Sequence, residues 1–554
     1  MSDASRANPG ASPDDPEVRR LLAAAGSALQ SGRLAEAERL SRRLLALAPA
    51  LAQAHFIASH VELRSGRPGR AAERAVEACR LSPGHPPWQL HEAFCLDLAG
   101  NKSLAAERAQ ALAGQRPIEP ALASHLVQLL YSLGRFEAAR DLCIDAIERE
   151  PASTHWQVNR ASLEVALGNL DEAREALRAV LDREPDHAEA WMMWSSLGGD
   201  DGGEDGGNDN RAASIERLGP LAERESLSAV DRAKLNYALG ALLEKEGRYA
   251  DSYNAVSRGA RAWRSQLRYD PAEEIEFFEA IEKTFDAAFV RSAGPGYDDD
   301  RPIFVVGLPR TGTTLVERIL SSHSQVGTAG ELPDFSRHLG RRIETLADAS
   351  VPSRAAMAPL ARQIDYAALG RDYIESSRHA AGERPHFVDK FPQNAIHIGP
   401  LRLALPRARI VLVRRHPMDA CYSMYKQLFT DIYQFSYDLD ELAAYFIAHE
   451  RLMRHWLRLF PDSLLTVRYE DVVDNLECEA RRMLEFCSLP WEEGCLAFHR
   501  NRNPSTTASA GQVRQPIYRG SLGKWRHFRE QLAGLEARLA DAGCLDEWAP
   551  PPED

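Results

Sequence analysis

The sequence lacks the features that mark several common classes of protein. Its eight cysteines show neither C-x-x-C pairs nor histidine-paired spacing, so they predict no metal centre and no disulfide framework. No apolar run approaches the roughly twenty residues of a membrane span, and the N-terminal segment lacks the core of a signal peptide. A net charge of −13 argues against nonspecific nucleic-acid binding. We therefore expect a cytoplasmic protein that binds neither membranes nor nucleic acids.

The N-terminal half contains three series of residues with one shared period of thirty-four, which is the period of tetratricopeptide repeats. Glycines stand at 32, 66, 100, 134 and 168, prolines at 49, 83, 117, 151 and 185, and alanines at 37, 71, 105, 139 and 173. Small residues let paired helices approach closely, glycine ends the first helix and proline closes the second. The period predicts an all-α tetratricopeptide solenoid over residues 17–285.

Composition suggests where this solenoid ends and a second domain begins. With 554 residues and 44% hydrophobic content, the chain can form at least two cores. Residues 1–16 are predicted to be disordered, and residues 198–210, which have no apolar side chain, to form a flexible acidic insertion. Residues 235–250 look like one more, degenerate repeat. Residues 286–301 are predicted to be a linker and residues 302–548 a second domain.

The segment 302–315 is an apolar strand followed by a glycine- and hydroxyl-rich turn that opens a helix. Backbone N–H groups of such a turn, together with the positive end of the helix dipole, hold a phosphate or sulfate. Gly307 and Gly312 keep the spacing of a Walker loop, but Thr313 stands where that loop has its lysine. The remaining cation is Arg310, a planar fork suited to a tetrahedral oxyanion. The segment predicts an anion site.

A second apolar strand, over residues 408–413, ends in Arg414 and Arg415 and is followed by a helical run that contains Ser423. One guanidinium and a hydroxyl near a helix start can hold a phosphate that carries close to two charges. The strand lacks the terminal aspartate that holds magnesium in a Walker B segment. The two strands together disfavour a P-loop kinase or nucleoside triphosphatase.

These motifs resemble those of sulfotransferases that use 3′-phosphoadenosine 5′-phosphosulfate (PAPS). The resemblance implies an α/β, P-loop-like domain with a mainly parallel central sheet, PAPS as the donor and no metal. It implies that the 5′-phosphosulfate binds to Arg310, Thr311, Gly312, Thr313, Thr314 and Leu315. It further implies that Arg415 and Ser423 hold the 3′-phosphate, with Arg414 as the alternative to Arg415.

Glu331 and Lys390 resemble catalytic residues of the tyrosylprotein sulfotransferases. Glu331 follows a glycine, twenty-one residues after Arg310, which is the register of the catalytic base in that family. A carboxylate near the acceptor can remove the hydroxyl proton during sulfonate transfer. Lys390 matches the family lysine after a short strand, and its compact charge can stabilise the leaving phosphate oxygen.

Three residues near the C-terminus complete the implied site. Tyr469 lies in a Tyr-Glu-Asp motif that resembles the family's adenine contact. Ser509 lies at the position of a catalytic-site serine, and Lys524, before a tryptophan, at the position of a nucleotide contact. The loop departs from the family pattern at Gln515, which stands where the family has a lysine before proline.

The sequence therefore predicts a bacterial-type sulfotransferase with an attached repeat region, acting through Glu331, Arg310, Lys390 and Ser509. The tetratricopeptide groove is expected to bind a peptide or protein, and a peptide tyrosine is the favoured acceptor. Hydroxyls of carbohydrates, lipids or small molecules are compatible with the same motifs, because those motifs describe the donor. A second alternative is a scaffold whose C-terminal domain binds PAPS or its product without catalysis.

Overall fold

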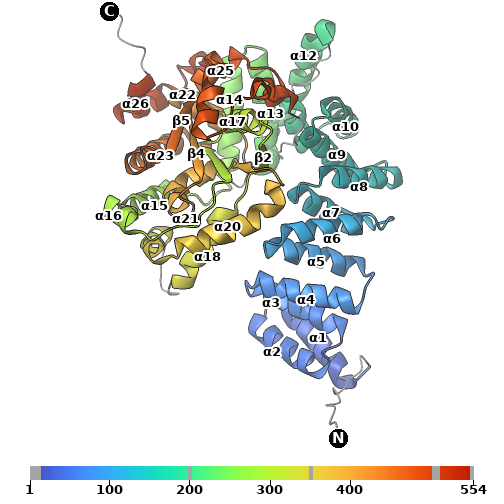
Figure 1. Ribbon diagram of the computed structural model, residues 1–554. Helices are drawn as coiled ribbons and strands as arrows, with labels where there is room; N and C mark the ends of the chain where they lie inside the picture. The colour runs from blue at the N-terminus through green and yellow to red at the C-terminus, as the bar shows by residue number, and fades with distance from the viewer. Residues whose placement is uncertain (1–13, 198–202, 348–352, 431, 502–511, 549–554) are drawn as a thin grey trace, which may run out of the picture. The chain divides into compact units, whose positions relative to one another are not determined.

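The computed structural model describes residues 14–197, 203–347, 353–430, 432–501 and 512–548 (Figure 1). The chain divides into two compact units, Met1–Leu163 and Glu164–Asp554. The division falls within helix α9 (Thr154–Leu167). Among the described residues, no helix is both long and apolar enough to cross a membrane.

The first unit is built from helices in antiparallel pairs, drawn in blue to cyan in Figure 1. They are α1 (Pro16–Gln30), α2 (Leu34–Leu47), α3 (Ala52–Arg64), α4 (Pro68–Leu81), α5 (Pro86–Leu98), α6 (Lys102–Ala113), α7 (Pro120–Ser132), α8 (Phe136–Arg149) and the first part of α9. The periodic residues explain the pairing. The periodic glycines all have positive φ, between 69° and 90°, and each ends the first helix of a pair; they are Gly32, Gly66, Gly100, Gly134 and Gly168.

The periodic alanines lie where paired helices meet. Ala37, Ala71, Ala105, Ala139 and Ala173 each have 0% of their surface exposed. A larger side chain at these positions would separate the helices, because the interior of a protein is close-packed. The predicted all-α repeat region, followed by a domain with a parallel sheet, is confirmed.

The second unit begins with further helices and then forms a sheet. Its helices before the sheet are α10 (Leu170–Arg183), α11 (Ala188–Ser196), α12 (Gly203–Ala222), α13 (Ala229–Lys245), α14 (Tyr249–Arg264), α15 (Pro271–Thr284) and α16 (Ala287–Ser292). The strands are β1 (Pro302–Gly307), β2 (Val326–Gly330), β3 (His386–Asp389), β4 (Arg409–Arg414) and β5 (Leu464–Arg468).

The remaining helices cover the sheet and form its connections. The α-helices are α17 (Thr313–Ser321), α18 (Asp334–Leu346), α19 (Arg354–Met357), α20 (Tyr366–Ala381), α21 (Ile398–Ala404), α22 (Pro417–Tyr425), α23 (Leu439–Leu459), α24 (Tyr469–Asp474), α25 (Leu476–Phe486) and α26 (Ala533–Asp541). Short 3₁₀ turns are η1 (Ala358–Gln363), η2 (Pro392–His397), η3 (Gln434–Tyr437), η4 (Glu493–Arg500), η5 (Gln512–Arg514), η6 (Arg519–Ser521), η7 (Lys524–Phe528) and η8 (Asp546–Trp548).

The described strands form one sheet with the order β2-β3-β1-β4-β5, and every neighbouring pair is parallel. Side chains of β1 alternate between two cores. Phe304 and Val306 face one cluster, whereas Ile303 and Val305 face the other. Because the sheet is parallel, the carboxyl ends of all five strands meet at one edge, where open α/β sheets bind their ligands.

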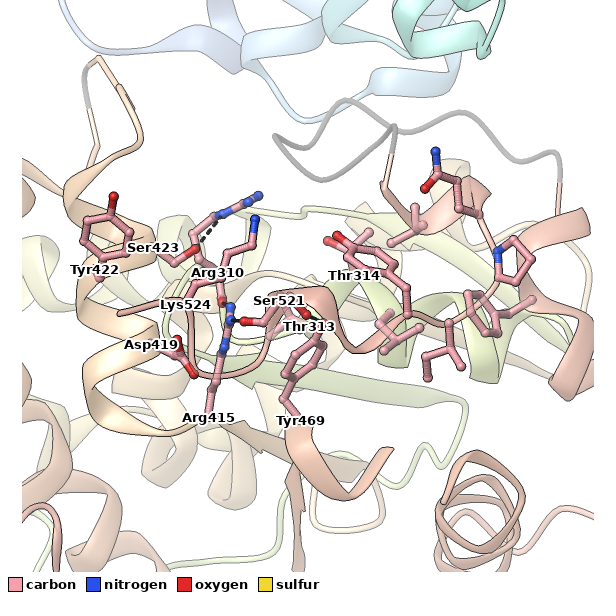
Figure 2. A pocket seen from close by; sticks show the side chains of 18 of the residues that line it. Arg310, Thr313, Thr314, Arg415, Asp419, Tyr422, Ser423, Tyr469, Ser521 and Lys524 are labelled. Carbon is pink, nitrogen blue, oxygen red and sulfur yellow. Dashed lines mark hydrogen bonds between the residues drawn. The ribbon is translucent and has the colours of Figure 1, made fainter. Parts of the chain in front are cut away.

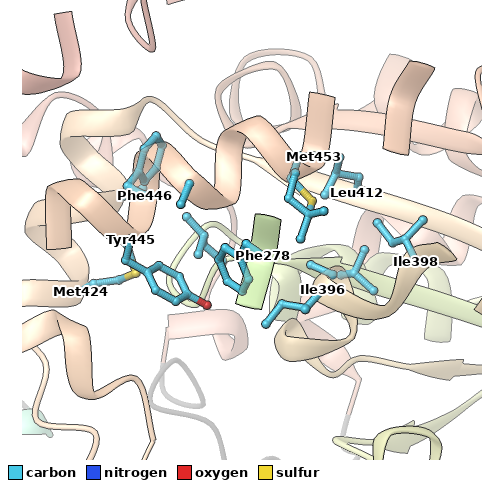
Figure 3. Close-up of a cluster of buried hydrophobic side chains, with 14 of the residues drawn as sticks. Phe278, Ile396, Ile398, Leu412, Met424, Tyr445, Phe446 and Met453 are labelled. Carbon is cyan, nitrogen blue, oxygen red and sulfur yellow. The ribbon is translucent and has the colours of Figure 1, made fainter. Parts of the chain in front are cut away.

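The helices that precede the sheet share its larger core, so the predicted division near residue 285 differs from the observed one. Phe278 of α15 packs with Ile396, Leu412 and Met453 in a single buried cluster (Figure 3). Tyr237 of α13 belongs to the same cluster. Apolar side chains on α13–α15 reach this core, which repeat spacing alone does not show.

Three predicted irregular segments also differ in the structure. Residues 203–210 of the predicted flexible insertion form the first turns of α12, and residues 198–202 lie outside the described part. Residues 1–13 of the predicted disordered N-terminus likewise lie outside it, whereas Asp15 caps α1 by accepting a 2.7 Å hydrogen bond from the Glu17 N–H. The predicted linker contains α16 and packs on the domain, since Tyr297 N–H donates to the Ala404 carbonyl at 2.8 Å.

Candidate functional site

The turn after β1 requires two of its glycines. Gly307 has φ +150°, and a Cβ there would lie 2.4 Å from the Val413 carbonyl oxygen of the neighbouring strand. Gly312 has φ +100°, and its Cβ would lie 2.4 Å from the Tyr469 ring. Side chains at either position would strain the backbone and collide with a neighbour. The turn is therefore held close to the ends of β4 and β5.

The turn places the start of α17 at the carboxyl edge of the sheet. Gly312 is the N-cap, and the first intrahelical hydrogen bond runs from Val316 N–H to the Gly312 carbonyl at 3.1 Å. The positive end of the helix dipole lies at Thr313 and Thr314. Thr311 stabilises the turn itself, because its hydroxyl donates to the Leu308 carbonyl at 2.7 Å.

A pocket opens over this turn (Figure 2). It collects most of the residues that the sequence predicted for the donor. Those that line it are Arg310, Gly312, Thr313, Thr314, Leu315, Arg415, Ser423, Tyr469 and Lys524. They follow the carboxyl ends of β1, β4 and β5 or lie in the C-terminal segment.

Two guanidinium groups dominate the charge of the pocket. Arg310 has a φ of +66°, and its Nε donates to the Ser423 hydroxyl at 3.4 Å (Figure 2). Arg415 donates to the Arg310 carbonyl at 2.9 Å and to the Ser521 carbonyl at 2.6 Å. Burial, together with the nearby charge of Arg415, lowers the pKa of Arg310 to about 10. Two like charges held this close favour binding of an anion.

Arg415, rather than Arg414, faces the pocket. Arg414 pairs with Glu450 and, at 2.7 Å, with Glu547, so its charge is already balanced by two carboxylates. The Arg415 guanidinium lies 4.8 Å from the centre of the Tyr469 ring. Among the described residues, no hydrogen-bond partner faces its buried Nε. Because a buried donor without an acceptor is costly, this atom suits an added acceptor such as a phosphate oxygen.

Asp419, which the sequence analysis did not single out, organises the part of the pocket wall that the C-terminal segment forms. Its carboxylate accepts hydrogen bonds from the backbone N–H groups of Gly523, at 2.7 Å, and Trp525, at 3.3 Å. These bonds fix the turn that carries Lys524. The Tyr469 hydroxyl lies 2.7 Å from the Ser521 hydroxyl and connects this turn to the end of β5.

Lining residues that the sequence analysis missed include Asp419, Tyr422 and Lys426 on or next to α22, and Tyr518 in the C-terminal segment. The first three could have been found. With Ser423 they recur at intervals of three and four residues, which places them on one face of a helix. Tyr518 carries no such signal, because only the tertiary fold brings the C-terminal segment over the pocket.

Glu331 and Lys390 meet at the other side of the same edge. They follow β2 and β3 directly, and the Lys390 ammonium donates to the Glu331 carboxylate. The Lys390 side chain is 2% exposed and that of Glu331 is 39% exposed, so the pair is anchored in the core and open on the carboxylate side. Neither is among the described residues that line the pocket. Ser509 lies outside the described residues.

Asp389, beside Lys390, is a second carboxyl group at this side. It is fully buried and accepts a hydrogen bond from the Tyr373 hydroxyl at 2.7 Å and a long one from Leu332 N–H at 3.4 Å. Burial raises the pKa of Asp389 to about 8 despite these donors. The raised pKa favours the neutral form of Asp389, and Lys390 pairs with Glu331 instead.

Comparison with known proteins assigns both parts of the chain. Residues 302–493 match the model of the sulfotransferase family, and residues 130–196 match a tetratricopeptide repeat. The chain thus contains a region similar to the sulfotransferase family and a region similar to a tetratricopeptide repeat, as the motifs predicted.

Curated relatives agree with this assignment at low identity. An uncharacterized protein of Aquifex aeolicus (strain VF5) is 28% identical over 71% of this chain and 51% of its own length. Protein-tyrosine sulfotransferase A of Caenorhabditis elegans is 23% identical over 42% of this chain and 62% of its own length. Protein-tyrosine sulfotransferase 1 of Danio rerio is 26% identical over 46% of this chain and 76% of its own length. The chain thus spans about half to three quarters of the length of these relatives.

Proposed function

We propose that the protein is a sulfotransferase that moves a sulfonate group from PAPS to an acceptor hydroxyl. The observation that carries the proposal is the cationic pocket at the carboxyl edge, where Arg310 and Arg415 adjoin the start of α17. Two features distinguish the site from those of nucleoside triphosphatases. Thr313 replaces the Walker lysine, and two arginines follow β4 where those enzymes have the carboxylate that holds magnesium. That the reaction needs no metal remains a prediction.

The pocket residues suit the three parts of the donor. Thr313, Thr314 and Leu315 at the start of α17, with Arg310, would hold the 5′-phosphosulfate. Arg415 and Ser423 would hold the 3′-phosphate, for which the buried Nε of Arg415 offers a donor.

The adenosine end would contact Tyr469 and Lys524. The Tyr469 ring already contacts Arg415 and Gly312, so it also supports the turn and the arginine. Lys524 is about half exposed and lies on the turn fixed by Asp419, where it can approach the ligand from the solvent side.

PAPS supplies a sulfonate group bonded to a phosphate leaving group. In the proposed step the acceptor oxygen forms a bond to sulfur as the bond between sulfur and the bridging phosphate oxygen breaks. Glu331 takes the acceptor proton, and 3′-phosphoadenosine 5′-phosphate leaves with the bond electrons. Arg310 and Lys390 stabilise the charge that develops on the oxygens, and Ser509 is proposed to contribute there as well.

The Glu331 side of the edge would then receive the acceptor. Tyr433 lies near Glu331. Burial and, to a smaller extent, the charge of the nearby Glu331 carboxylate raise the pKa of Tyr433. Its φ is +57°, a conformation that a bulky residue seldom adopts and that often marks functional sites. A peptide or protein tyrosine is the proposed acceptor, since the named relatives are protein-tyrosine sulfotransferases and the repeat region can bind peptides.

The first test is thermal unfolding with 3′-phosphoadenosine 5′-phosphate and, separately, with ATP and magnesium. A ligand at about a hundred times its dissociation constant stabilises a protein by roughly 2.7 kcal/mol. Stabilisation by the 3′-phosphorylated nucleotide is expected. Stabilisation by ATP and magnesium alone would overturn the proposal.

The second test is transfer of labelled sulfonate from PAPS to tyrosine peptides, simple phenols and sugars. Transfer to a tyrosine peptide, lost in the matched phenylalanine peptide, supports the proposed acceptor. Transfer to sugars alone would keep the reaction and overturn the acceptor. Nucleotide binding without transfer to any acceptor would instead favour the scaffold alternative.

A further inference from the structure

A carboxylate from the helical region reaches the wall of the donor pocket. Glu244, in the last turn of α13, accepts hydrogen bonds from the Lys426 ammonium at 2.7 and 2.8 Å. Lys524 approaches the same carboxylate at 3.5 Å, and the Tyr422 hydroxyl donates to it at 3.3 Å. Lys426, Lys524 and Tyr422 all line the pocket. Glu244 thus joins three lining residues that come from two separate segments.

The α13–α14 hairpin that carries Glu244 is fixed against the pocket. The Tyr237 hydroxyl donates to the Tyr425 carbonyl at 3.1 Å, and the Tyr425 hydroxyl lies 3.0 Å from that of Ser257. Tyr249 stacks on His527 of η7 with ring centres 4.2 Å apart. Contacts to both α22 and η7 hold Glu244 in place, so the carboxylate acts from a rigid support.

Local helix chemistry does not explain a glutamate at this position. The carboxylate lies near the negative end of the α13 dipole, where acidic side chains are unfavourable. Its side chain is only 13% exposed. Burial would raise the pKa of Glu244, but the charges of Lys426 and Lys524 outweigh burial and lower it. A residue that opposes local preference in this way typically has a function.

Lys426 lies on the side of the pocket proposed for the 3′-phosphate. It follows Ser423 by three residues at the end of α22, which places the two side chains on one face of the helix. Its side chain is 24% exposed, which leaves part of it open to the pocket. Its ammonium group adds to the positive charge of Arg310, Arg415 and Lys524, which also line the pocket.

We propose that Glu244 is a positioning residue for the donor: its two hydrogen bonds hold the Lys426 ammonium at the side of the pocket proposed for the 3′-phosphate. This inference rests on the proposed function and assigns Lys426 as a further phosphate-binding residue. It also makes the last helical hairpin part of the nucleotide site.

The proposal has a consequence for pH, because Lys426 faces several charges. Glu244 on α13 favours its charged form, whereas Lys524 on η7, Arg310 after β1 and burial disfavour it, and Tyr422 on its own helix lies 5.0 Å away. Without the Glu244 charge, the pKa of Lys426 falls further. The lysine then loses its proton at a lower pH, so binding of a 3′-phosphate weakens as the pH rises.

The test compares 3′-phosphoadenosine 5′-phosphate with adenosine 5′-phosphate in calorimetric titrations of the full chain at pH 7 and pH 9. The variant is Glu244→Gln, and the control is Glu246→Gln, which alters a carboxylate two residues away that pairs with Arg211 at 3.0 Å. We expect Glu244→Gln to reduce the preference for the 3′-phosphorylated nucleotide about tenfold, with a larger loss at pH 9. Glu246→Gln should keep the wild-type preference at both pH values.

A second variant, Lys426→Gln, covers the case in which Glu244→Gln does not fold. It leaves the sequence of the α13–α14 hairpin unchanged and should lose the same preference for the 3′-phosphorylated nucleotide. The added loss at pH 9 should be absent, because the titrating lysine has been removed. An unchanged preference in folded Glu244→Gln, or in Lys426→Gln, would overturn the inference while the proposed function stands. If the wild-type chain shows no preference for the 3′-phosphate, the proposed function fails and this inference fails with it.

Discussion

The carboxyl edge of the sheet has two sides with different electrostatics. After β1 and β4, Arg310 and Arg415 lie side by side and donate to a hydroxyl and to carbonyl oxygens. After β2 and β3, Lys390 is buried against the Glu331 carboxylate. The first side has net positive charge and suits an anion. The second is a pair of opposite charges whose carboxylate is partly exposed.

Under the proposed function, this difference would separate donor binding from proton transfer on one parallel sheet. Consecutive strands deliver their residues to one edge, so strand order decides which chemistries become neighbours. In the order β2-β3-β1-β4, the Glu331–Lys390 pair lies on one side of the turn after β1, and Arg415 lies on the other. If the two sides have separate roles, substitutions on each should have separable effects.

The largest expected effect comes from the Glu331 side. Glu331→Gln should lower turnover about 10²–10⁴-fold, because the acceptor proton loses its base. Affinity for 3′-phosphoadenosine 5′-phosphate should change little, since Glu331 does not line the pocket described here. Steady-state transfer rates measure turnover, and calorimetry on the same protein sample measures nucleotide affinity. The control is Glu383→Gln, which alters an exposed carboxylate. Near-normal turnover would exclude Glu331 as the base.

Arg310→Ala tests the opposite side. We expect turnover to fall roughly 10²–10³-fold, as for the loss of one preorganised donor to a transition-state oxyanion, and nucleotide affinity to fall with it. Arg310→Lys should recover little, because a point charge cannot form the two parallel bonds of a guanidinium. Arg407→Ala, which removes a surface arginine paired with Asp298 and Asp300, is the control. Loss of turnover with full nucleotide affinity would contradict the assignment of Arg310 to donor binding.

Much of the donor side could be predicted from sequence, because its residues lie within short segments around strand ends. The spacing of Gly307 and Gly312 predicted a tight turn after β1, and the structure brings Arg310 and Gly312 of this turn together with Arg415 and Ser423. Asp419 could have been found from its helical spacing with Ser423, but its bond to Gly523 could not. Glu244 could not be predicted in this way, because its position depends on contacts with Lys426 and Lys524, far away in the chain.

The domain division was harder to predict for a related reason. Repeat spacing reports how each helix packs on the next, and it predicted the paired helices of the first unit correctly. It contains no information on which helices also contact the sheet. Phe278 and Tyr237 bury themselves in the core of the sheet domain, and this shared core joins α13–α15 to the second unit.

The two neighbouring arginines after β4 give a smaller and more selective effect. Arg415→Ala should weaken binding of 3′-phosphoadenosine 5′-phosphate about tenfold more than binding of adenosine 5′-phosphate. Arg414→Ala should keep that preference but lower the melting temperature, because Glu450 loses a partner in the interior. If Arg414→Ala loses the preference for the 3′-phosphorylated nucleotide and Arg415→Ala keeps it, the 3′-phosphate site would be assigned to Arg414 instead.

The pH dependence of stability reports on Asp389 at the Glu331 side. Its pKa is about 8 in the folded state and about 3.9 in an unfolded chain, so between these values only the folded state keeps the proton. The stability that the neutral carboxyl provides is complete below about pH 4 and is lost as the pH rises to about 8. Asp389→Asn should remove this slope, which is at most about 1.4 kcal/mol per pH unit. Urea unfolding of the wild-type protein and of Asp389→Asn from pH 5 to pH 9 measures this slope. If the free energy of unfolding changes with pH in the same way for both proteins, the raised pKa of Asp389 is contradicted.

The smallest expected effect compares a glycine from each side of the edge. Gly312 and Gly330 both have positive φ, of +100° and +70°, so alanine strains the backbone by roughly 1–2 kcal/mol at each. At Gly312 the added Cβ also meets the Tyr469 ring at 2.4 Å, whereas at Gly330 nothing lies within 4 Å. Gly312→Ala should therefore destabilise the protein by about 1 kcal/mol more than Gly330→Ala, and only Gly312→Ala should weaken nucleotide binding. Equal losses of stability with equal nucleotide affinity would show that the close approach of Gly312 to Tyr469 does not shape the pocket.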